Sequence, residues 1–362
     1  MTTVLETVDG WVAGGARAAL ATVVETKRSA PRAIGSKMAL DDAGAVIGAV
    51  SGGCVEGAVI AVAEDILRGA GPRLLHYGLD DGEAWDVGLP CGGEITVWVE
   101  AYDPSGLQAR FSALARDRRR AALVTALDGV PVPGAKLLVT ADTGAPEGTL
   151  GDAELNAAAV ALARAALWSE RAERREHAGA SLFVDVAAPP PRLIVFGAGD
   201  VAAQLTAVAR LAEWRPFVID PRSRFATPAR FPAAERVIAA WPEAALRELE
   251  AIDRATAICV LTHDPKLDDA ALRAALATDA SYIGAMGSRR AQDKRRARLL
   301  AAGVDEEGMA RIAAPIGLDL GGQTAAETAL SIMAEIVALR RGRSGGRLAD
   351  AGGPIHDAAV VA

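Results

Sequence analysis

The sequence predicts an α/β protein with an N-terminal α+β domain and a C-terminal Rossmann-like domain, whose sheet is parallel and doubly wound. Three observations predict it. The chain has 362 residues, enough for two domains of roughly 150 residues. Three consecutive prolines interrupt it near residue 190, where neither a helix nor a central strand can continue. After them, short apolar runs alternate with amphipathic runs, which is the pattern of repeated βαβ units.

The proline run sets the expected domain boundaries. We expect the α+β domain over residues 1–186, a stiff linker over 187–191 and the Rossmann-like domain over 192–342. The Gly-rich residues 343–362 are expected to form a mobile tail.

Composition excludes several classes of protein. Hydrophobic residues make up 51% and charged residues 23%, which is typical of a globular protein. Lys and Arg number 39 against 46 Asp and Glu, and this net charge of −7 argues against a nucleic-acid-binding protein. The N-terminus lacks the pattern of a secretory signal, and no run of about 18 apolar residues indicates a membrane span. We therefore expect a cytoplasmic protein with reduced cysteines.

In the N-terminal half, alternating apolar residues predict strands, and apolar residues at helical spacing predict helices. The expected strands cover residues 20–27, 74–77, 94–100, 121–127 and 135–140, with a hairpin over 36–50 that turns at 41–44. The expected helices cover residues 55–68, 105–120 and 152–174.

In the C-terminal half, the apolar runs predict buried strands separated by helices. The strands are expected over residues 193–197, 215–220, 236–239, 256–262 and 281–286. A last helix is expected from 324 to 341, where Thr324 and Glu327 form a capping-box pattern.

A dinucleotide-binding fingerprint follows the first strand of the C-terminal half. Gly197, Gly199 and Ala202 form a G-x-G-x-x-A pattern in which Gly197 permits a tight turn and Gly199 lets N–H groups approach a phosphate. Asp220 ends the next strand, where a ribose-binding carboxylate is expected. The crevice is thus expected to bind NAD(P) or another nucleotide. The alternative is a Rossmann fold that uses no nicotinamide cofactor.

A glycine-rich turn opens the first expected helix. It consists of Ser51, Gly52, Gly53 and Cys54. Since N–H groups at a helix N-terminus stabilise anions, the pKa of Cys54 is expected to be lowered if its sulfur points at them. A thiolate there can ligate a soft metal or carry a sulfur atom. The alternative is a small packed cysteine in a tight turn.

A second cysteine lies beside glycines in the same domain. Cys91 precedes Gly92 and Gly93, just before an expected strand. The two Gly–Cys turns allow the thiols of Cys54 and Cys91 to face one cleft, and separate packing of the two cysteines is the alternative. Cys259, in contrast, lies within an apolar strand and is expected to be a core residue.

The segment 29–37 joins two expected strands and combines a proline, a glycine, hydroxyls and two cations. Its cations, Arg32 and Lys37, suit an anion such as a phosphate. A plain polar loop is the alternative.

Two further segments follow expected strands, at the edge where open α/β sheets bind ligands, and a third leads into the last helix. His263 is a candidate acid–base group, or else it caps the next helix together with Asp264. The remaining candidates for ligand binding are Gly287 and Arg289, and Gly317 and Asp319 in the glycine-rich loop before the last helix.

Together these motifs resemble the xanthine dehydrogenase accessory family, XdhC/CoxI. The matching stretches are SAPRAIGSKM, SGGCVEGAV, GLPCGGEITV, VFGAGDVAAQL, VIDPRSRFATPARFP, VLTHDPKLDD, YIGAMGSRR and PIGLDLGGQTAAETALSIMAEI. They occur in family order and cover residues 30 to 340, nearly the whole chain.

The resemblance implies a function. Such proteins bind molybdenum cofactor, assist its sulfuration with a cysteine desulfurase, and hand it to the apo-enzyme of a molybdenum hydroxylase such as xanthine or carbon monoxide dehydrogenase. It also implies an XdhC/CoxI domain joined to a Rossmann-like domain, often in a homodimer. The pterin phosphate would lie on a Gly-rich helix-start loop. Cys54 and Cys91, candidate molybdenum ligands, would face the molybdenum or the incoming sulfur.

Two positions depart from the family pattern. Asp200 stands where the family commonly has His, and an acid there would repel a phosphate. Ala325 stands where Pro is frequent, which changes only a helix start. The rival hypothesis is an NAD(P)-dependent oxidoreductase, but a Tyr-x-x-x-Lys pair is lacking because Met286 lies four residues after Tyr282. A third is a scaffold that only docks the target enzyme.

Overall fold

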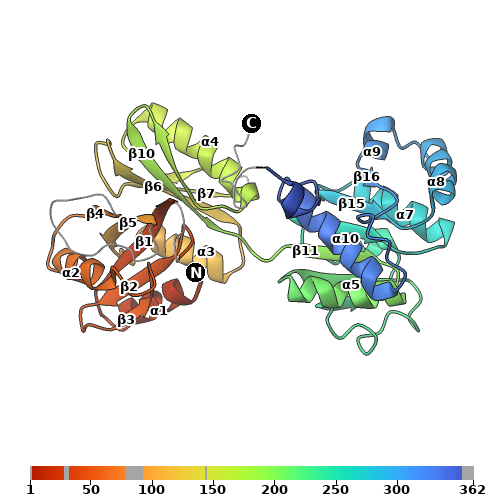
Figure 1. Ribbon diagram of the computed structural model, residues 1–362, viewed down its shortest axis with the longest axis horizontal. Helices are drawn as coiled ribbons and strands as arrows, with labels where there is room; N and C mark the ends of the chain where they lie inside the picture. The colour runs from red at the N-terminus through yellow and green to blue at the C-terminus, as the bar shows by residue number, and fades with distance from the viewer. Residues whose placement is uncertain (1, 28–31, 79–92, 143–144, 353–362) are drawn as a thin grey trace. The chain divides into compact units, whose positions relative to one another are not determined.

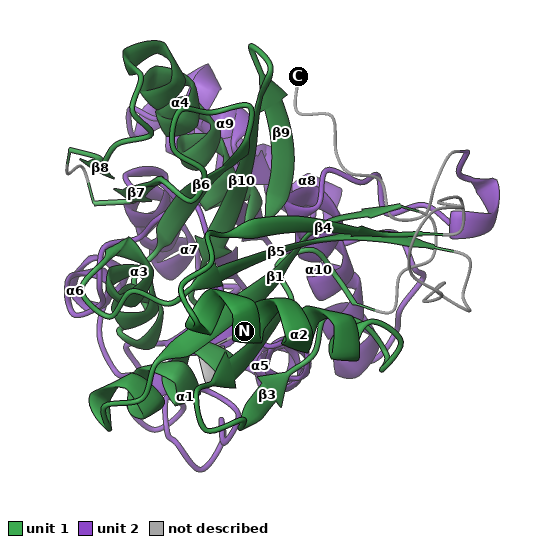
Figure 2. Ribbon diagram, turned by 90° about the vertical axis from the view of Figure 1, so that its left-hand side faces the viewer, with its two compact units in different colours: residues 1–189 green, residues 190–362 purple. Residues whose placement is uncertain are grey.

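The computed structural model describes residues 2–27, 32–78, 93–142 and 145–352. The chain divides into two compact units, residues 1–189 and 190–362 (Figure 2). The division falls within the proline run. Each unit is described by itself.

Within the described residues, unit 1 contains two five-stranded antiparallel sheets (Figure 1). The first, in the order β3-β2-β1-β5-β4, comprises β1 (Ala18–Lys27), β2 (Lys37–Asp41), β3 (Val46–Gly48), β4 (Arg73–Tyr77) and β5 (Glu94–Ala101). The second, in the order β8-β7-β6-β10-β9, comprises β6 (Ala121–Asp128), β7 (Lys136–Thr140), β8 (Glu147–Gly148), β9 (Glu173–His177) and β10 (Ala180–Ala187).

The two sheets face each other, and a helix covers the outer side of each. α2 (Glu56–Leu67) packs on the first sheet and α4 (Ala153–Ser169) on the second. The inner faces share a core with α1 (Thr2–Ala13) and α3 (Leu107–Arg116). Because side chains alternate between these inner and outer apolar layers, the central strands are buried on both faces.

The two halves of unit 1 repeat one design that the sequence analysis did not predict. Each half runs helix, three strands, helix and two strands, and the two sheets have the same strand order. Gly48 and Gly148 end equivalent strands with φ of 77° and 89°, and a Cβ at either would collide with the carbonyl oxygen of Lys37 or Lys136. The buried pairs Val50 and Leu150, Val55 and Leu155, Ala63 and Ala163, and Leu67 and Leu167 continue the correspondence.

Unit 2, as far as the described residues go, is built on one six-stranded parallel sheet. Its order, β13-β12-β11-β14-β15-β16, is that of the doubly wound Rossmann fold. The strands are β11 (Arg192–Phe196), β12 (Arg215–Ile219), β13 (Arg236–Ile238), β14 (Thr256–Val260), β15 (Tyr282–Ala285) and β16 (Ile312–Ala313). The expected fold class is therefore confirmed.

Helices cover both faces of this sheet (Figure 1). One face carries α5 (Asp200–Leu211) and α10 (Ala325–Arg340). The other carries α6 (Pro242–Arg247), α7 (Pro265–Leu276), α8 (Arg289–Ala301) and α9 (Glu306–Ala310). A short 3₁₀ turn, η1 (Leu348–Asp350), lies in the segment expected to be a tail, of which residues 353–362 are outside the described residues.

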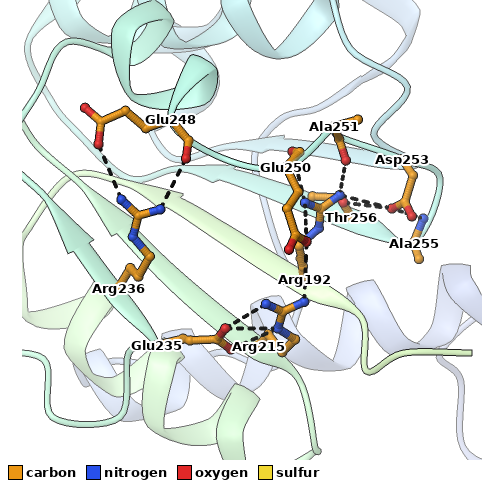
Figure 3. A network of polar contacts seen from close by, with 10 residues as sticks. All are labelled: Arg192, Arg215, Glu235, Arg236, Glu248, Glu250, Ala251, Asp253, Ala255 and Thr256. Carbon is orange, nitrogen blue, oxygen red and sulfur yellow. Dashed lines mark hydrogen bonds and ion pairs between the residues drawn. The ribbon is translucent and has the colours of Figure 1, made fainter. Parts of the chain in front are cut away.

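Arginines close the edge of the sheet at which the strands begin (Figure 3). Arg192 donates to the carbonyl oxygens of Glu250, at 3.1 Å, and Ala251. Arg215, at the start of β12, pairs with Glu235 at 2.7 Å. Since ligands bind at the opposite edge of such sheets, this network is structural.

Two predicted helices are too long, and the one expected over 105–120 ends at Arg116. The helix expected over 152–174 ends at Ser169, because Glu170 turns the chain with a φ of 55°. β9 then begins at Glu173 and pairs with β10. This short strand is fixed by its pairing with β10, which follows it in the sequence.

Candidate functional site

Ser51 organises the turn that carries Cys54. Its hydroxyl accepts the N–H groups of Gly53, Cys54 and Val55 at 3.2, 3.1 and 3.4 Å. Glu56 accepts both the Ser51 hydroxyl and the Ser51 N–H. Burial raises the pKa of Glu56, but the hydrogen bonds from Ser51 outweigh it, so the pKa lies below its ordinary value. A charged carboxylate thus holds the turn in place.

The backbone donors at the start of α2 are directed at this hydroxyl rather than at the sulfur of Cys54. Cys54 is half-buried and packs against the apolar core beneath α2. Gly52 and Gly53 are exposed, and at Gly53 the space that a Cβ would fill is open. The turn therefore presents bare backbone beside a partly accessible thiol.

The two cations of the segment 29–37 lie in different surroundings. Arg32 is exposed, and its Nε lies 3.5 Å from the carbonyl oxygen of Ser51, so this segment touches the Cys54 turn. Lys37 corrects the sequence-based expectation. It is buried, and its Nζ lies 2.6 Å from Asp185 Oδ2. Because a buried carboxylate already neutralises it, Lys37 is a structural residue and not a ligand for phosphate.

Cys91 and Gly92 lie outside the described residues, so a cleft shared by Cys54 and Cys91 stays a prediction. Gly93 is described, and it is buried at the entry to β5.

In unit 2, a cavity of about 420 Å³ lies at the carboxyl ends of β11 and β14. Gly197, Gly199, Arg222 and His263 contribute to its lining. Gly197 has a φ of 108°, and a Cβ there would lie 2.8 Å from Thr262 Cγ2, so the turn requires glycine. At Gly199 that space is open, which leaves the N-terminus of α5 accessible.

Asp220 is buried behind this turn, and its carboxylate is fully engaged. It accepts the Ala198 N–H at 2.9 Å and a two-point contact from Arg222 Nε and Nη2, at 2.9 and 2.7 Å. Burial raises the pKa of Asp220, but Arg222 and the backbone donors outweigh it and hold the pKa below its ordinary value. The expected ribose-binding acid thus fastens the glycine turn, and Arg222 lines the cavity in its place.

His263 and Asp264 line the same cavity after β14. Asp264 caps α7 by accepting the Lys266 N–H at 2.9 Å. Asp264 therefore supplies the cap. His263 is exposed on the cavity wall, and its role as an acid–base group stays a prediction.

The loop after β15 adds Met286 to the cavity. Gly287 follows with a φ of 136°, and Ser288 caps α8. Arg289 is exposed in the first turn of that helix.

The glycine-rich loop before α10 packs against that helix. The Gly317 N–H donates to Glu335 Oε2 at 2.8 Å, and a Cβ at Gly317 would collide with Ser331. Asp319 is exposed. The capping box expected at the start of α10 is present and confirms the structural role of Glu327.

Sequence reasoning did not predict that Glu56 holds the Cys54 turn or that Arg222 pairs with Asp220. Each could be found from a local signal: an acid five residues after Ser51, and an arginine two residues after Asp220. Within the described residues, no group of three or more His, Cys, Asp or Glu side chains could hold a metal ion. Over the same residues, none of the helices has the length and apolar character needed to cross a membrane.

Two family models match the chain. The model described as the XdhC and CoxI family matches residues 11–78, in unit 1, and the XdhC Rossmann domain matches residues 193–336, in unit 2.

Relatives match nearly the whole length. The chain is 28% identical over 331 residues to a probable xanthine dehydrogenase subunit from Bacillus subtilis, covering 90% of this chain and 93% of that protein. It is 27% identical over 327 residues to the molybdenum cofactor insertion chaperone PaoD of Escherichia coli, covering 90% and 84%. The crystal structure of a xanthine dehydrogenase from Bacillus halodurans has the same fold, with a TM-score of 0.60 at 24% identity over 96% of this chain and 97% of that one.

Proposed function

We propose, on the premise that the chain belongs to the XdhC and CoxI family, that it is a maturation chaperone for a molybdenum hydroxylase. It binds molybdenum cofactor as its cargo, supports sulfuration of the cofactor, and inserts it into an apo-enzyme of the xanthine dehydrogenase or carbon monoxide dehydrogenase type. The observation that carries the proposal is the similarity to PaoD along 90% of the chain.

The Cys54 turn supplies the chemistry that such a role requires. Its thiol is partly accessible, and the exposed Gly52 and Gly53 leave room for a large ligand. Soft thiolates suit both molybdenum and sulfur, so Cys54 and Cys91 are proposed to face the metal or the incoming sulfur. Ser51, Arg32, Gly92 and Gly93 are proposed to border the cargo.

The cavity of unit 2 is proposed to hold an anionic group, of the cargo or of a nucleotide. Arg222 and the accessible N-terminus of α5 favour an anion, whereas the Asp200 carboxylate on the same wall opposes one. His263, Gly287, Arg289, Gly317 and Asp319, on the wall or on neighbouring loops, are proposed to border the ligand. An NAD(P)-dependent oxidoreductase is supported less well, because its ribose-binding carboxylate would have to be released by Arg222.

The proposed setting is the cytoplasm, with the hydroxylase apo-enzyme and a cysteine desulfurase as partners and a second copy of the chain in a homodimer. The protein should be purified anaerobically from a molybdenum-replete host and assayed for molybdenum and pterin. Both are expected to co-purify, and Cys54→Ala should fold normally but fail to activate the hydroxylase.

Cys259→Ala is the matched control, since it removes a thiol from the core of unit 2 and should leave activation intact. A protein that binds neither molybdenum nor pterin would contradict the proposal. So would full activation by the variant that combines Cys54→Ala and Cys91→Ala.

A further inference from the structure

A second cavity, of about 460 Å³, lies within unit 1, and none of the candidate site residues from the sequence lines it. It is lined by the ends of β1 and β4, the start of β5 and part of β9. The polar side chains on its wall include Glu25, His76, Glu94, Thr96, Arg174 and Glu176.

A β-bulge in β1 places Glu25 on this wall. Val23 pairs with Val97, and both belong to the apolar core beneath α2. Regular alternation would put Glu25 on that same side. The pairing shifts between Val23 and Glu25, however, so that Glu25 lies opposite Thr96 and shares its face. Bulges are frequent next to functional sites because they redirect a side chain in this way.

A chain of hydrogen bonds then sets the proton on His76. The Thr96 hydroxyl donates its single proton to Glu25 Oε2 at 3.3 Å, and Arg174 Nη1 donates to the same oxygen at 2.8 Å. The contact between Thr96 Oγ1 and His76 Nδ1, at 3.1 Å, must therefore use the proton of the imidazole. In the neutral ring, Nε2 is left as an acceptor.

The charges of the wall also favour acceptors. Its two cations are already paired: Lys27 with Glu94 at 3.3 Å, and Arg174 with Glu25 at 2.8 Å and with Glu176 at 3.2 Å. Glu94 and Glu176 remain partly exposed, and carboxylates outnumber cations. This environment disfavours a phosphate and favours a ligand that donates N–H groups.

We infer that this cavity binds the N–H edge of a 2-amino-4-oxopyrimidine ring, as found in a pterin, with His76 Nε2 and the Glu94 and Glu176 carboxylates as acceptors. The inference rests on the proposed function, in which the cargo carries a pterin. The guanidine-like edge of such a ring has adjacent N–H donors, which match the two oxygens of a carboxylate. The cavity thus holds the ring of the cargo and not its phosphate.

Binding of pterin itself to the full chain tests the inference, because its fluorescence reports the complex directly. Saturable binding is expected, and inorganic phosphate should not displace the pterin. Glu176→Gln and His76→Ala should each weaken binding by about tenfold, since each removes one hydrogen-bond acceptor. Glu173→Gln is the matched control. Glu173 lies in the same strand and pairs with Arg175 at 2.7 Å, but it does not contribute to the cavity wall.

Three results would overturn the inference: no saturable binding, displacement by phosphate, or unchanged binding by a folded Glu176→Gln variant. Activation of the hydroxylase is measured on the same preparations to separate the two proposals. Activation without pterin binding would overturn this inference and leave the proposed function standing. Pterin binding that depends on Glu176, without activation, would support the cavity and contradict the proposed function.

Discussion

Lys37 and Asp185 form an ion pair inside unit 1, with 2.6 Å between Nζ and Oδ2 and side chains only 3% and 6% exposed. Lys37 belongs to the first sheet and Asp185 to the second. Lys136 and Glu100 make the equivalent bridge in the opposite direction, at 2.8 Å. Each ammonium also contacts a threonine hydroxyl of its own sheet. Two reciprocal bridges therefore join the repeated halves.

Lys37→Ala should destabilise unit 1 by about 3–5 kcal/mol, because it leaves the Asp185 carboxylate buried without a partner. Replacing both residues, Lys37→Met with Asp185→Leu, should cost much less. Urea denaturation of the full chain measures both effects. The control is Arg68→Ala, which breaks an exposed ion pair with Asp65 and should change the free energy of unfolding by less than about 1 kcal/mol. A similar cost for Lys37→Ala and Arg68→Ala would contradict the prediction.

Two glycines of one turn should differ sharply in their tolerance of alanine. Gly197→Ala meets a φ of 108° and a Cβ contact of 2.8 Å with Thr262, so we expect a loss of roughly 2–4 kcal/mol. Gly199→Ala meets open space and should cost under about 1 kcal/mol. The thermal unfolding midpoints of the two variants provide the comparison. Equal midpoints would show that the turn is not constrained as described.

Cys54 should react with an alkylating reagent faster than Cys259. Burial raises the pKa of the Cys259 thiol and shields it, whereas Cys54 is half-buried beside exposed glycines. Mass spectrometry of the labelled peptides gives the two rates, and unfolding the protein in denaturant should bring them together. If the folded protein labels both residues equally, Cys54 is a packing residue and its proposed chemistry fails.

The lowered pKa of Asp220 should make the stability of unit 2 depend on pH. Because the folded pKa lies below the unfolded value of about 3.9, the stabilisation is complete above that value and is lost as the pH falls through the folded pKa. Asp220→Asn should therefore lower the unfolding midpoint at neutral pH and make its decline below pH 4 shallower. The exposed Asp200→Asn serves as the control. An equally steep acid decline in Asp220→Asn would refute the assignment.

Local patterns were sufficient to predict most of unit 2. Each of its long strands is an apolar run, and the positive φ at Gly197 and the cap at Thr324 belong to local turn and cap motifs. The contact between Asp220 and Arg222 is also local. The dinucleotide-binding pattern, however, does not reveal that Arg222 already engages both oxygens of the Asp220 carboxylate.

The arrangement of unit 1 depends instead on partners far apart in the sequence. Lys37 was predicted to be a cation available to a ligand. Asp185, which neutralises it, lies far away in the sequence and in the other sheet, so no local pattern reveals the ion pair. The role of Glu25 follows from a shift in strand pairing that no residue pattern specifies. The proposed role of His76 as an acceptor depends on its contact with Thr96, which lies in a neighbouring strand.

The repeat in unit 1 has a consequence for stoichiometry. With Val55 equivalent to Leu155, the counterpart of Cys54 in the second half is Glu154, and Asp152 caps α4 where the first half uses the Ser51 turn. A cargo site centred on Cys54 then has a capacity of one cofactor per chain, and each molecule contains its own thiol-free version of the turn.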